Sequence, residues 1–264
     1  MIGQVPRVPA QARSRAAGLI TRAAAGPVLV ITLTDEELAA LDGAPPGSLA
    51  PQPWLAALDE PGRLLACQVA LRGLAARGLA VPAGPGPGGS ATVAIHEDLR
   101  AALDLRRTAP AVVTAQRRSG RGLDVRVLHL HHGGLLEEGI SPGGLHTLTV
   151  TTPSDAARRL AGFADPGPAA GDPPTQPPQI VPLADIAAGP GPSSLTGARY
   201  VTTVSRLNRG TTPPHEQRLT IYALPGRVRT SELAATGGPP ALAITQLGGA
   251  QLRERLATLL AGQD

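Results

Sequence analysis

Residues 64–163 contain the pattern that decides the fold. They read LLACQVALRGLAARGLAV, a Pro/Gly tip, TVAIHEDLRAALDLRR and, from residue 112, VVTAQRRSGRGLDVRVLHLHHGGLLEEGISPGGLHTLTVTTPSDAARRLAGF. In the first part, apolar residues recur at helical spacing until Gly78, a glycine placed to end a helix. A Pro/Gly stretch expected to be irregular follows, then a short strand over residues 92–96 and a helix with acidic residues first and Arg last. This order is typical of a winged-helix unit.

The second part of this stretch predicts neighbouring strands joined by tight turns. Alternation along the chain favours a strand over residues 124–132 with one partly polar face, and strands are also expected over 112–118 and 145–150. The Gly-Gly pair at 133–134 predicts a hairpin before LLEEGI. The closing TTPSD then supplies an N-cap Thr and a first-turn Pro for the helix SDAARRLAGF.

The same order of elements recurs near the C-terminus. From residue 200 the chain reads YVTTVSRL, a turn, QRLTIYAL, a turn at Pro225 and Gly226, RVRTSELA, PALAITQL and a final helix, GAQLRERLATLLAG. The two series match as strand, strand, hairpin, strand and helix, with Gly134 opposite Gly226. We therefore predict an α/β (α+β) protein with a central, mostly antiparallel sheet, pseudo-two-fold repeated halves and flanking helices.

Breaks in this pattern predict the domain organisation. Residues 1–26 lack a clear period and are expected to be a flexible N-terminal arm. Residues 27–163 form the first half, and residues 164–179 are a Pro/Gly-rich linker or loop. Residues 180–264 form the second half, which we expect to be one continuous domain with the first.

The first half opens with a strand and a well-capped helix. The β-branched run VLVITL at residues 28–33 predicts a buried strand. The following TDEE places Thr34 at the N-cap and Glu37 at the third helical position, where each side chain can satisfy a backbone amide of the other residue. Gly43 is expected to end this helix.

Composition excludes several classes of protein. Of the 264 residues, 42% are hydrophobic but only 2% aromatic, so the core is built from Leu, Val, Ile and Ala. Every basic residue is Arg, a bias typical of GC-rich actinobacterial coding sequences, and without Lys a net charge of only +4 gives the high pI of 10.4. The single cysteine, Cys67, excludes an internal disulfide. No apolar run of about 18 residues or signal-peptide pattern is present, so we expect a cytoplasmic protein.

The histidines at residues 129–132 are the most reactive cluster in the sequence. On a strand His129 and His131 share a face, so a metal ion could bind them, with His146 joining from a neighbouring strand. Against this, Glu137 and Glu138 lie past a turn and offer no assured third ligand. No nucleophile motif or phosphate loop is present, and we predict no catalytic residue, no metal, no cofactor and no enzymatic activity.

A winged-helix DNA-binding protein is the alternative reading. The basic residues that favour it are Arg72, Arg77, Arg100, Arg106, Arg107, Arg117, Arg118 and Arg121. Against it, the helix that would read the bases, LACQVALRGLAARGL, is mostly apolar and small, so few of its side chains could reach base edges.

Several phrases in the sequence carry a family resemblance. A strand followed by LTDEELAAL, a helix ending ALRGLAARGLAV, then HEDLRAALDL, sheet strands and a Pro/Gly gap before a second strand-and-helix half resembles the EspG family of type VII (ESX) secretion-associated chaperones of actinobacteria. The resemblance implies a mixed α/β fold with an antiparallel sheet. It also implies a non-enzymatic cytoplasmic chaperone that binds secreted PE/PPE-like or helical-hairpin proteins and keeps them soluble for export.

The resemblance brings no short motif, so the partner surface is predicted from the sheet pattern. We expect a partner to contact the sheet around His129, His131 and Leu135 in the first half and at Tyr222 and Leu224 in the second half. The opposing interpretation is that these side chains pack beneath the helices.

Overall fold

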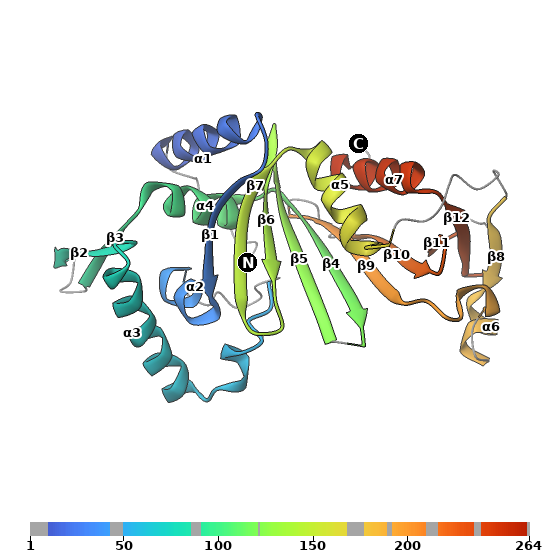
Figure 1. The fold of residues 1–264 in the computed structure, drawn as a ribbon, viewed down its shortest axis with the longest axis horizontal. Helices are drawn as coiled ribbons and strands as arrows, with labels where there is room; N and C mark the ends of the chain where they lie inside the picture. The colour runs from blue at the N-terminus through green and yellow to red at the C-terminus, as the bar shows by residue number, and fades with distance from the viewer. Residues whose placement is uncertain are drawn as a thin grey trace. The chain divides into compact units, whose positions relative to one another are not determined.

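The computed structural model describes residues 10–42, 50–85, 91–120, 122–167, 177–188, 192–209, 216–234 and 239–262. Figure 1 labels its elements. The helices are α1 (Ala10–Ala23), α2 (Asp35–Asp42), α3 (Glu60–Ala76), α4 (Glu97–Thr108), α5 (Pro153–Ala164), α6 (Leu183–Ala188) and α7 (Gly249–Ala261). The strands are β1 (Val28–Thr34), β2 (Ala80–Pro85), β3 (Ala91–Ile95), β4 (Ala111–Ser119), β5 (Gly122–His131), β6 (Gly134–Ile140), β7 (Leu145–Thr151), β8 (Gln179–Pro182), β9 (Tyr200–Asn208), β10 (Glu216–Leu224), β11 (Arg227–Leu233) and β12 (Ala241–Leu247).

Ten strands within the described ranges form one sheet in the order β1-β7-β6-β5-β4-β9-β10-β11-β12-β8. The strand pairings with a defined register are all antiparallel. Strands β4–β7 and β9–β12 are two meanders that meet at the β4–β9 pair, and each meander is followed by a helix, α5 or α7. This mirrored order confirms the predicted α+β fold with repeated halves on an antiparallel sheet.

The turn glycines of the two meanders also correspond. Gly133 between β5 and β6 has φ +81°, and Gly226 between β10 and β11 has φ +69°, a region that glycine adopts without steric cost. Gly133 rather than Gly134 is therefore the counterpart of Gly226. Gly134 is required for a different reason, because a Cβ there would lie 2.8 Å from Cγ2 of Ile20.

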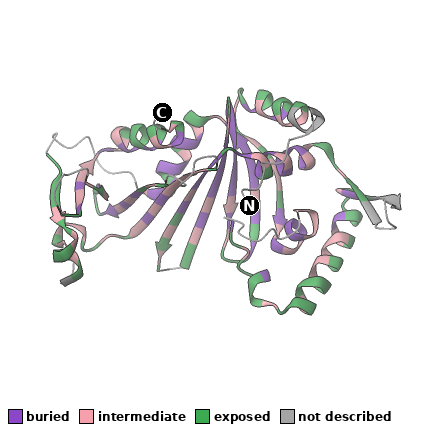
Figure 2. Ribbon diagram, turned by 180° about the vertical axis from the view of Figure 1, so that it is seen from behind, coloured by how far each residue is buried: buried purple, intermediate pink, exposed green. Residues whose placement is uncertain are grey.

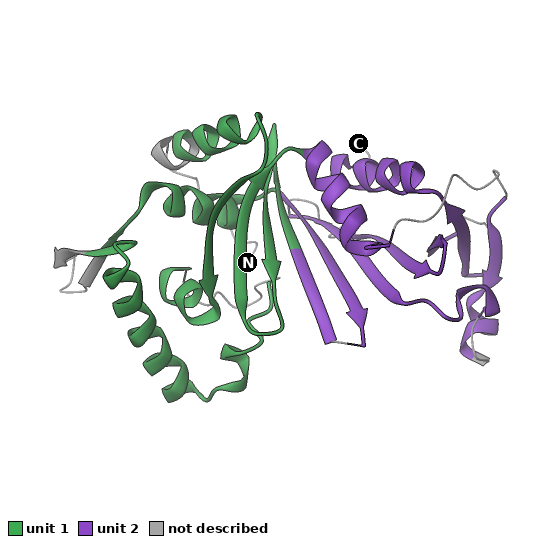
Figure 3. Ribbon diagram, viewed as in Figure 1, with its two compact units in different colours: residues 1–110, 127–152 green, residues 111–126, 153–264 purple. Residues whose placement is uncertain are grey.

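The chain forms two compact units that are interleaved in sequence (Figure 3). Unit 1 comprises residues 1–110 and 127–152, and unit 2 comprises residues 111–126 and 153–264. This division differs from the expected halves at 27–163 and 180–264. The reason is that β4 pairs with β9 and α5 packs on α7, so long-range contacts group these elements with the C-terminal part of the chain.

Unit 1 packs α1, α2 and α4 against its strands. Figure 2 shows how burial is distributed over the elements. Aliphatic side chains fill this core, as the low aromatic content requires. Its large buried members include Leu19, Leu33, Leu38, Leu74, Leu99, Leu103, Leu105, Leu136, Leu148 and Val150.

The N-terminal segment differs from the expected flexible arm. Within residues 1–26 the described part is α1, a helix whose Leu19 and Ala23 are only 2% and 1% exposed. Arg15 binds Asp104 of α4 at 3.2 Å, and Arg22 binds Asp98 of the same helix at 2.7 Å. The short apolar stripe of α1 is sufficient to pack the helix against unit 1. The scattered Arg and Ala residues had hidden this periodicity in the sequence. Residues 1–9 lie outside the described part.

The winged-helix-like segment is a helix, a two-stranded ribbon and a second helix. Strand β2 includes Pro82 and Pro85, residues that were expected to be irregular, and a two-stranded ribbon tolerates them because its outer edges need no partner. Its tip, residues 86–90, lies outside the described part. Helix α3 buries only Leu74, while Leu64 and Val69 are 62% and 57% exposed, so its helical periodicity does not mark a core face.

Unit 2 packs α5 and α7 together over one face of its strands. The buried side chains on this face are Leu160, Val204, Leu219, Ile221, Leu252, Leu256 and Leu260. Arg206 on β9 donates hydrogen bonds to the carbonyl oxygens of Leu259, at 2.9 Å, and Leu260, in the last turn of α7. These bonds satisfy carbonyl groups that have no partner inside the helix, and so attach the end of α7 to the sheet.

The predicted linker at residues 164–179 lies mostly outside the described part. Its described ends are the last residue of α5, the residues up to Gly167 and the segment that enters β8 at Gln179. No helix in the described ranges is long and apolar enough to cross a membrane.

Candidate functional site

The predicted histidine cluster is part of a buried ion network in unit 1. The Glu138 carboxylate, fully buried on β6, lies 3.0 Å from Nε2 of His129 and 2.7 Å from Nδ1 of His146. On the other side of the imidazole ring, Nε2 of His146 lies 2.6 Å from Oδ1 of Asp35. We call the set Asp35, Asp42, Arg106, His129, Glu138 and His146 the Glu138 network.

Arg106 extends this network to both ends of α2. Its Nε donates to Oε2 of Glu138 at 3.0 Å, and its Nη1 binds the Asp42 carboxylate. Asp42 is the last residue of α2, and Asp35 is the first. The carboxylates at the two ends of this short helix are thus joined through β6, β7 and α4.

Asp35 also organises the segment that follows α2. Its Oδ2 accepts hydrogen bonds from the backbone amides of Trp54, at 2.7 Å, and Leu55, at 3.0 Å. Its own amide donates to the carbonyl oxygen of Gly144 at 2.8 Å. Gly144 has φ +72°, and a Cβ there would lie 3.0 Å from the Asp35 carboxylate, so glycine is needed at this turn.

The electrostatics of the network favour its charged form. Burial opposes a charge on Glu138, but the hydrogen bonds from His129 and His146 and the Arg106 guanidinium outweigh it and hold the pKa of Glu138 far below 4.5. Burial likewise disfavours the His146 cation, yet Glu138 and Asp35 raise the pKa of His146 above 6.5. The pKa of Arg106 is raised because the two carboxylates outweigh its own burial.

The residues of the network do not form a metal site. Sequence spacing placed Glu138 past a turn, but the β6–β7 register brings it next to His146. Carboxylates already occupy both ring nitrogens of His146 and Nε2 of His129. Among the described residues, no group of three His, Cys, Asp or Glu side chains could hold a metal ion.

The five predicted partner-contact residues lie in different environments. His129, Leu135 and Leu224 are buried, at 3%, 0% and 2% exposure, so their side chains are not at a surface that a partner could touch in this structure. His131 is half-buried, and its Nε2 lies 2.8 Å from the Leu105 carbonyl oxygen. Burial lowers the pKa of His131. Tyr222 is half-buried and lines an open cleft.

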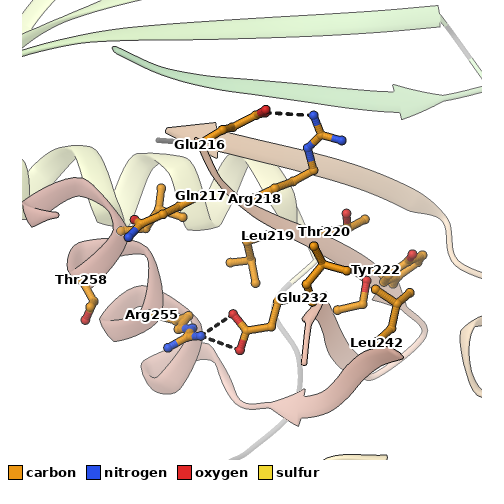
Figure 4. A pocket seen from close by; sticks show the side chains of 13 residues that line it. Glu216, Gln217, Arg218, Leu219, Thr220, Tyr222, Glu232, Leu242, Arg255 and Thr258 are labelled. Carbon is orange, nitrogen blue, oxygen red and sulfur yellow. Dashed lines mark hydrogen bonds and ion pairs between the residues drawn. The ribbon is translucent and has the colours of Figure 1, made fainter. Parts of the chain in front are cut away.

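This cleft lies in unit 2, where β10 and β11 separate. Their pairing ends at Thr220 and Ser231, while β10 begins at Glu216 and β11 continues to Leu233. The space has a volume of about 660 Å³. Figure 4 shows it from close by. Its further lining residues include Leu219, Tyr222, Leu242, Arg255, Thr258 and Leu259.

The cleft is both apolar and charged. Leu233 at its edge is 71% exposed, a large value for a leucine. Across the cleft, Arg255 of α7 pairs with Glu232 of β11, and Arg218 pairs with Glu216 at 2.9 Å within β10 (Figure 4). Hydrogen bonds to Arg218 and Ser205 lower the pKa of Glu216. The cleft therefore combines aliphatic surface with two ion pairs.

A second hollow adjoins the cleft on β4, β9 and β10. It has a volume of about 440 Å³ and shares Glu216 and Arg218 with the cleft. The side chains that line it are otherwise mainly hydroxyls and amides, including Thr114, Gln116, Thr203 and Ser205. These residues stand on the sheet face opposite Val204 and Leu219, which are buried, so unit 2 presents a polar sheet surface next to the apolar cleft.

Of the five predicted partner-contact residues, Tyr222 is the one that lines the cleft. Leu233 and Leu242 pair across β11 and β12, and Arg255 comes from α7, so the site depends on strand register and helix placement. The run RVRTSEL carried one usable signal, an apolar residue next to a charge at the end of a strand.

Three arginines of the winged-helix-like segment form ion pairs within unit 1. Arg77 binds Glu37 at 2.6 Å, and Arg106 and Arg107 both bind Asp42. Internal ion pairs neutralise these cations, which leaves fewer of them to contact phosphates. This arrangement disfavours the DNA-binding alternative.

The protein therefore belongs to the mixed α/β class, with one mirrored antiparallel sheet and an open cleft in unit 2. A similar solved structure is the type VII secretion system chaperone EspG5 of Mycobacterium tuberculosis, determined in complex with a PE25–PPE41 dimer. The two chains share 12% identity with a TM-score of 0.54, over 89% of this chain and 96% of EspG5. The chain thus has an EspG-like fold.

Sequence comparisons add nothing to this likeness. No protein-family model matches the chain, and none of the curated proteins matches it. At 12% identity the similarity to EspG5 concerns the fold, so the function has to be argued from the site.

Proposed function

We propose that this protein is a non-enzymatic cytoplasmic chaperone that binds secreted proteins of the PE/PPE type, or related helical hairpins, and keeps them soluble for export. The observation that carries the proposal is the EspG-like fold over 89% of the chain, because EspG5 is a type VII secretion chaperone solved with a PE–PPE dimer. The open cleft of unit 2 supplies a surface for such a partner.

The chemistry of the cleft supports a protein partner rather than a reaction. Tyr222, Leu233 and Leu242 offer apolar area, and Arg255 and Glu232 can exchange their mutual ion pair for contacts with a partner. Cys67, the only thiol, has its pKa raised by burial and by the Glu36 carboxylate, which makes it a poor nucleophile. We place the partner contact at the cleft.

The first test is to co-express the chain with PE–PPE pairs from the same genome and to measure complex formation by co-purification and titration. We expect a stoichiometric complex with at least one pair. Leu233→Asp should weaken binding at least tenfold, because a charge replaces an apolar contact of roughly 1.5–3 kcal/mol. Tyr222→Ala should weaken it by a similar factor.

The matched control is Leu123→Asp. Leu123 is 41% exposed in the same unit but does not line the cleft, so this variant should bind as the parent does. Absence of a complex with every PE–PPE pair would contradict the proposed function. Equal loss of binding in the Leu233 and Leu123 variants would contradict the cleft as the binding site.

A further inference from the structure

The side chain of His146 has a geometry that fixes its protonation state. It is fully buried on β7, with Nδ1 2.7 Å from Oε1 of Glu138 and Nε2 2.6 Å from Oδ1 of Asp35. An ionised carboxylate only accepts hydrogen bonds, so each ring nitrogen must carry a proton. We propose that His146 is a permanent buried imidazolium at neutral pH and that its two protons attach α2 and the Trp54 segment to β6 and β7 of unit 1.

The alternative proton placement is disfavoured by the other contacts of the two carboxylates. If one carboxyl carried the proton, the ring could be neutral. However, Oδ2 of Asp35 already accepts the amides of Trp54 and Leu55, and Oε2 of Glu138 lies within hydrogen-bonding distance of Arg106 Nε and His129 Nε2. Both carboxylates are surrounded by donors, an environment that favours their ionised form. The proton therefore belongs to His146.

The three carboxylates of the network are matched by three cations when His146 is charged and Arg107, which binds Asp42 from outside the network, is counted. The carboxylates of Asp35, Asp42 and Glu138 face the cations of Arg106, Arg107 and His146. Loss of the His146 proton would leave Asp35 and Glu138 as neighbouring buried anions. Such a pair is costly in a low-dielectric interior.

Glu137 of β6 lies opposite Thr149 of β7, on the other face of the sheet from Glu138 and His146, and charged side chains on the other packed elements have partners. The strand β1, whose Leu33 lies opposite His146, contains no titratable residue. On α1, Arg15 and Arg22 are paired with Asp104 and Asp98 of α4. On α2, Glu37 is paired with Arg77. On β5, His131 is bonded to a backbone carbonyl.

The consequence is a pH-dependent attachment of one segment. Above the pKa of His146, which Glu138 and Asp35 raise against burial, the ring keeps a single N–H and can no longer donate to both Asp35 and Glu138. Because Asp35 holds the amides of Trp54 and Leu55, α2 and this segment should then loosen together. Trp54 is the only tryptophan of the chain and is 47% exposed in the structure, so its fluorescence reports the further exposure of a partly solvated indole.

Two measurements on the unaltered protein test the proposal. Nitrogen NMR of the histidine rings near neutral pH should show both nitrogens of His146 protonated, while a neutral ring would overturn the proposal. Titration from neutral pH to about 10 should shift the emission of the partly exposed Trp54 further toward that of a fully solvated indole, with a midpoint above 6.5. An emission that stays constant over this range would also overturn it.

The variant His146→Gln separates the attachment from general stability. A glutamine amide carries both N–H donors on one nitrogen, so it cannot reach carboxylates on opposite sides as the imidazolium does. Trp54 should therefore be more solvated than in the parent at neutral pH and should show no alkaline transition. The matched control is His96→Gln, which changes an exposed histidine outside the network and should titrate like the parent. If His146→Gln keeps the parental transition, the proposal is wrong. If it does not fold, the NMR result on the unaltered protein decides.

Discussion

At the scale of single residues, Arg106 shows how burial changes the role of a basic side chain from a possible ligand contact to an internal ion pair. In the sequence it counts as one cation at the end of a helix and as a candidate DNA contact. In the structure it is 7% exposed and joins the carboxylates of Glu138 and Asp42. Its charge is therefore used to stabilise unit 1.

Replacing Arg106 tests this role. Arg106→Met keeps much of the length but leaves Glu138 and Asp42 without their shared cation, so we expect a loss of about 3–5 kcal/mol in the free energy of unfolding. Arg107→Met is the matched control, because Arg107 also binds Asp42 but is half-exposed, and its loss should cost less than about 1 kcal/mol. Urea denaturation at neutral pH measures both values. Equal losses would contradict the buried role of Arg106.

At the scale of elements, the start of α2 is set by Thr34, which precedes the helix, and by Glu37 in its first turn. The predicted capping box is present: the amide of Glu37 donates to Oγ1 of Thr34, and the amide of Thr34 donates to Oε2 of Glu37, both at 3.2 Å. Because α2 carries Asp35 and Asp42 at its two ends, this cap also sets the geometry of the Glu138 network.

Thr34→Ala removes half of this cap. We expect a loss of about 1 kcal/mol in the free energy of unfolding, since one amide at the start of α2 loses its acceptor. Thr34→Ser retains the hydroxyl and should lose less than half as much. Thermal or urea unfolding of the two variants provides the comparison, and indistinguishable stabilities would show that the hydroxyl does not cap the helix.

The helix α3 shows a case in which a local sequence pattern predicted the helix but not its burial. Its apolar residues follow helical spacing, and a helix is present, yet Leu64, Leu65 and Val69 are exposed. Periodicity reports which residues share a face of a helix. It cannot report whether another element covers that face.

At the scale of the whole molecule, the Glu138 network sets the response of stability to acid. The folded pKa of Glu138 lies far below its unfolded value of about 4.5. Because of this difference, the Glu138 carboxyl binds a proton more readily in the unfolded chain than in the folded one. The stability that the ionised Glu138 contributes is therefore complete above about pH 4.5 and is lost as pH falls toward the folded pKa.

We therefore expect the free energy of unfolding to fall steadily below about pH 4.5. Glu138→Gln should be less stable at neutral pH and should show a weaker acid dependence. Glu216→Gln is the control, because Glu216 also has a lowered pKa but is exposed and paired only at the surface, so its acid dependence should match that of the parent. Urea denaturation at several pH values in this range measures how steeply the free energy of unfolding falls with pH in each variant. A parental slope in Glu138→Gln would contradict the assignment.

The sequence by itself determined the local elements and their order. Alternation predicted the strands, the TDEE and TTPSD caps predicted the starts of α2 and α5, and the repeated order predicted two matching meanders. These signals are local, because side-chain periodicity and cap hydrogen bonds involve residues within a few positions of each other. The resemblance to EspG rested on that order, and the fold agrees with it.

Only the tertiary structure decided which residues meet. Glu138 reaches His146 through the β6–β7 register, Asp35 reaches it across 111 positions of sequence, and the cleft exists because β10 and β11 separate beneath α7. Sequence reasoning could not find these contacts, because a one-residue change of register would move every side chain to the other face of the sheet. The structure buries His129, Leu135 and Leu224, whose patterns had left open whether they contact a partner or belong to the core.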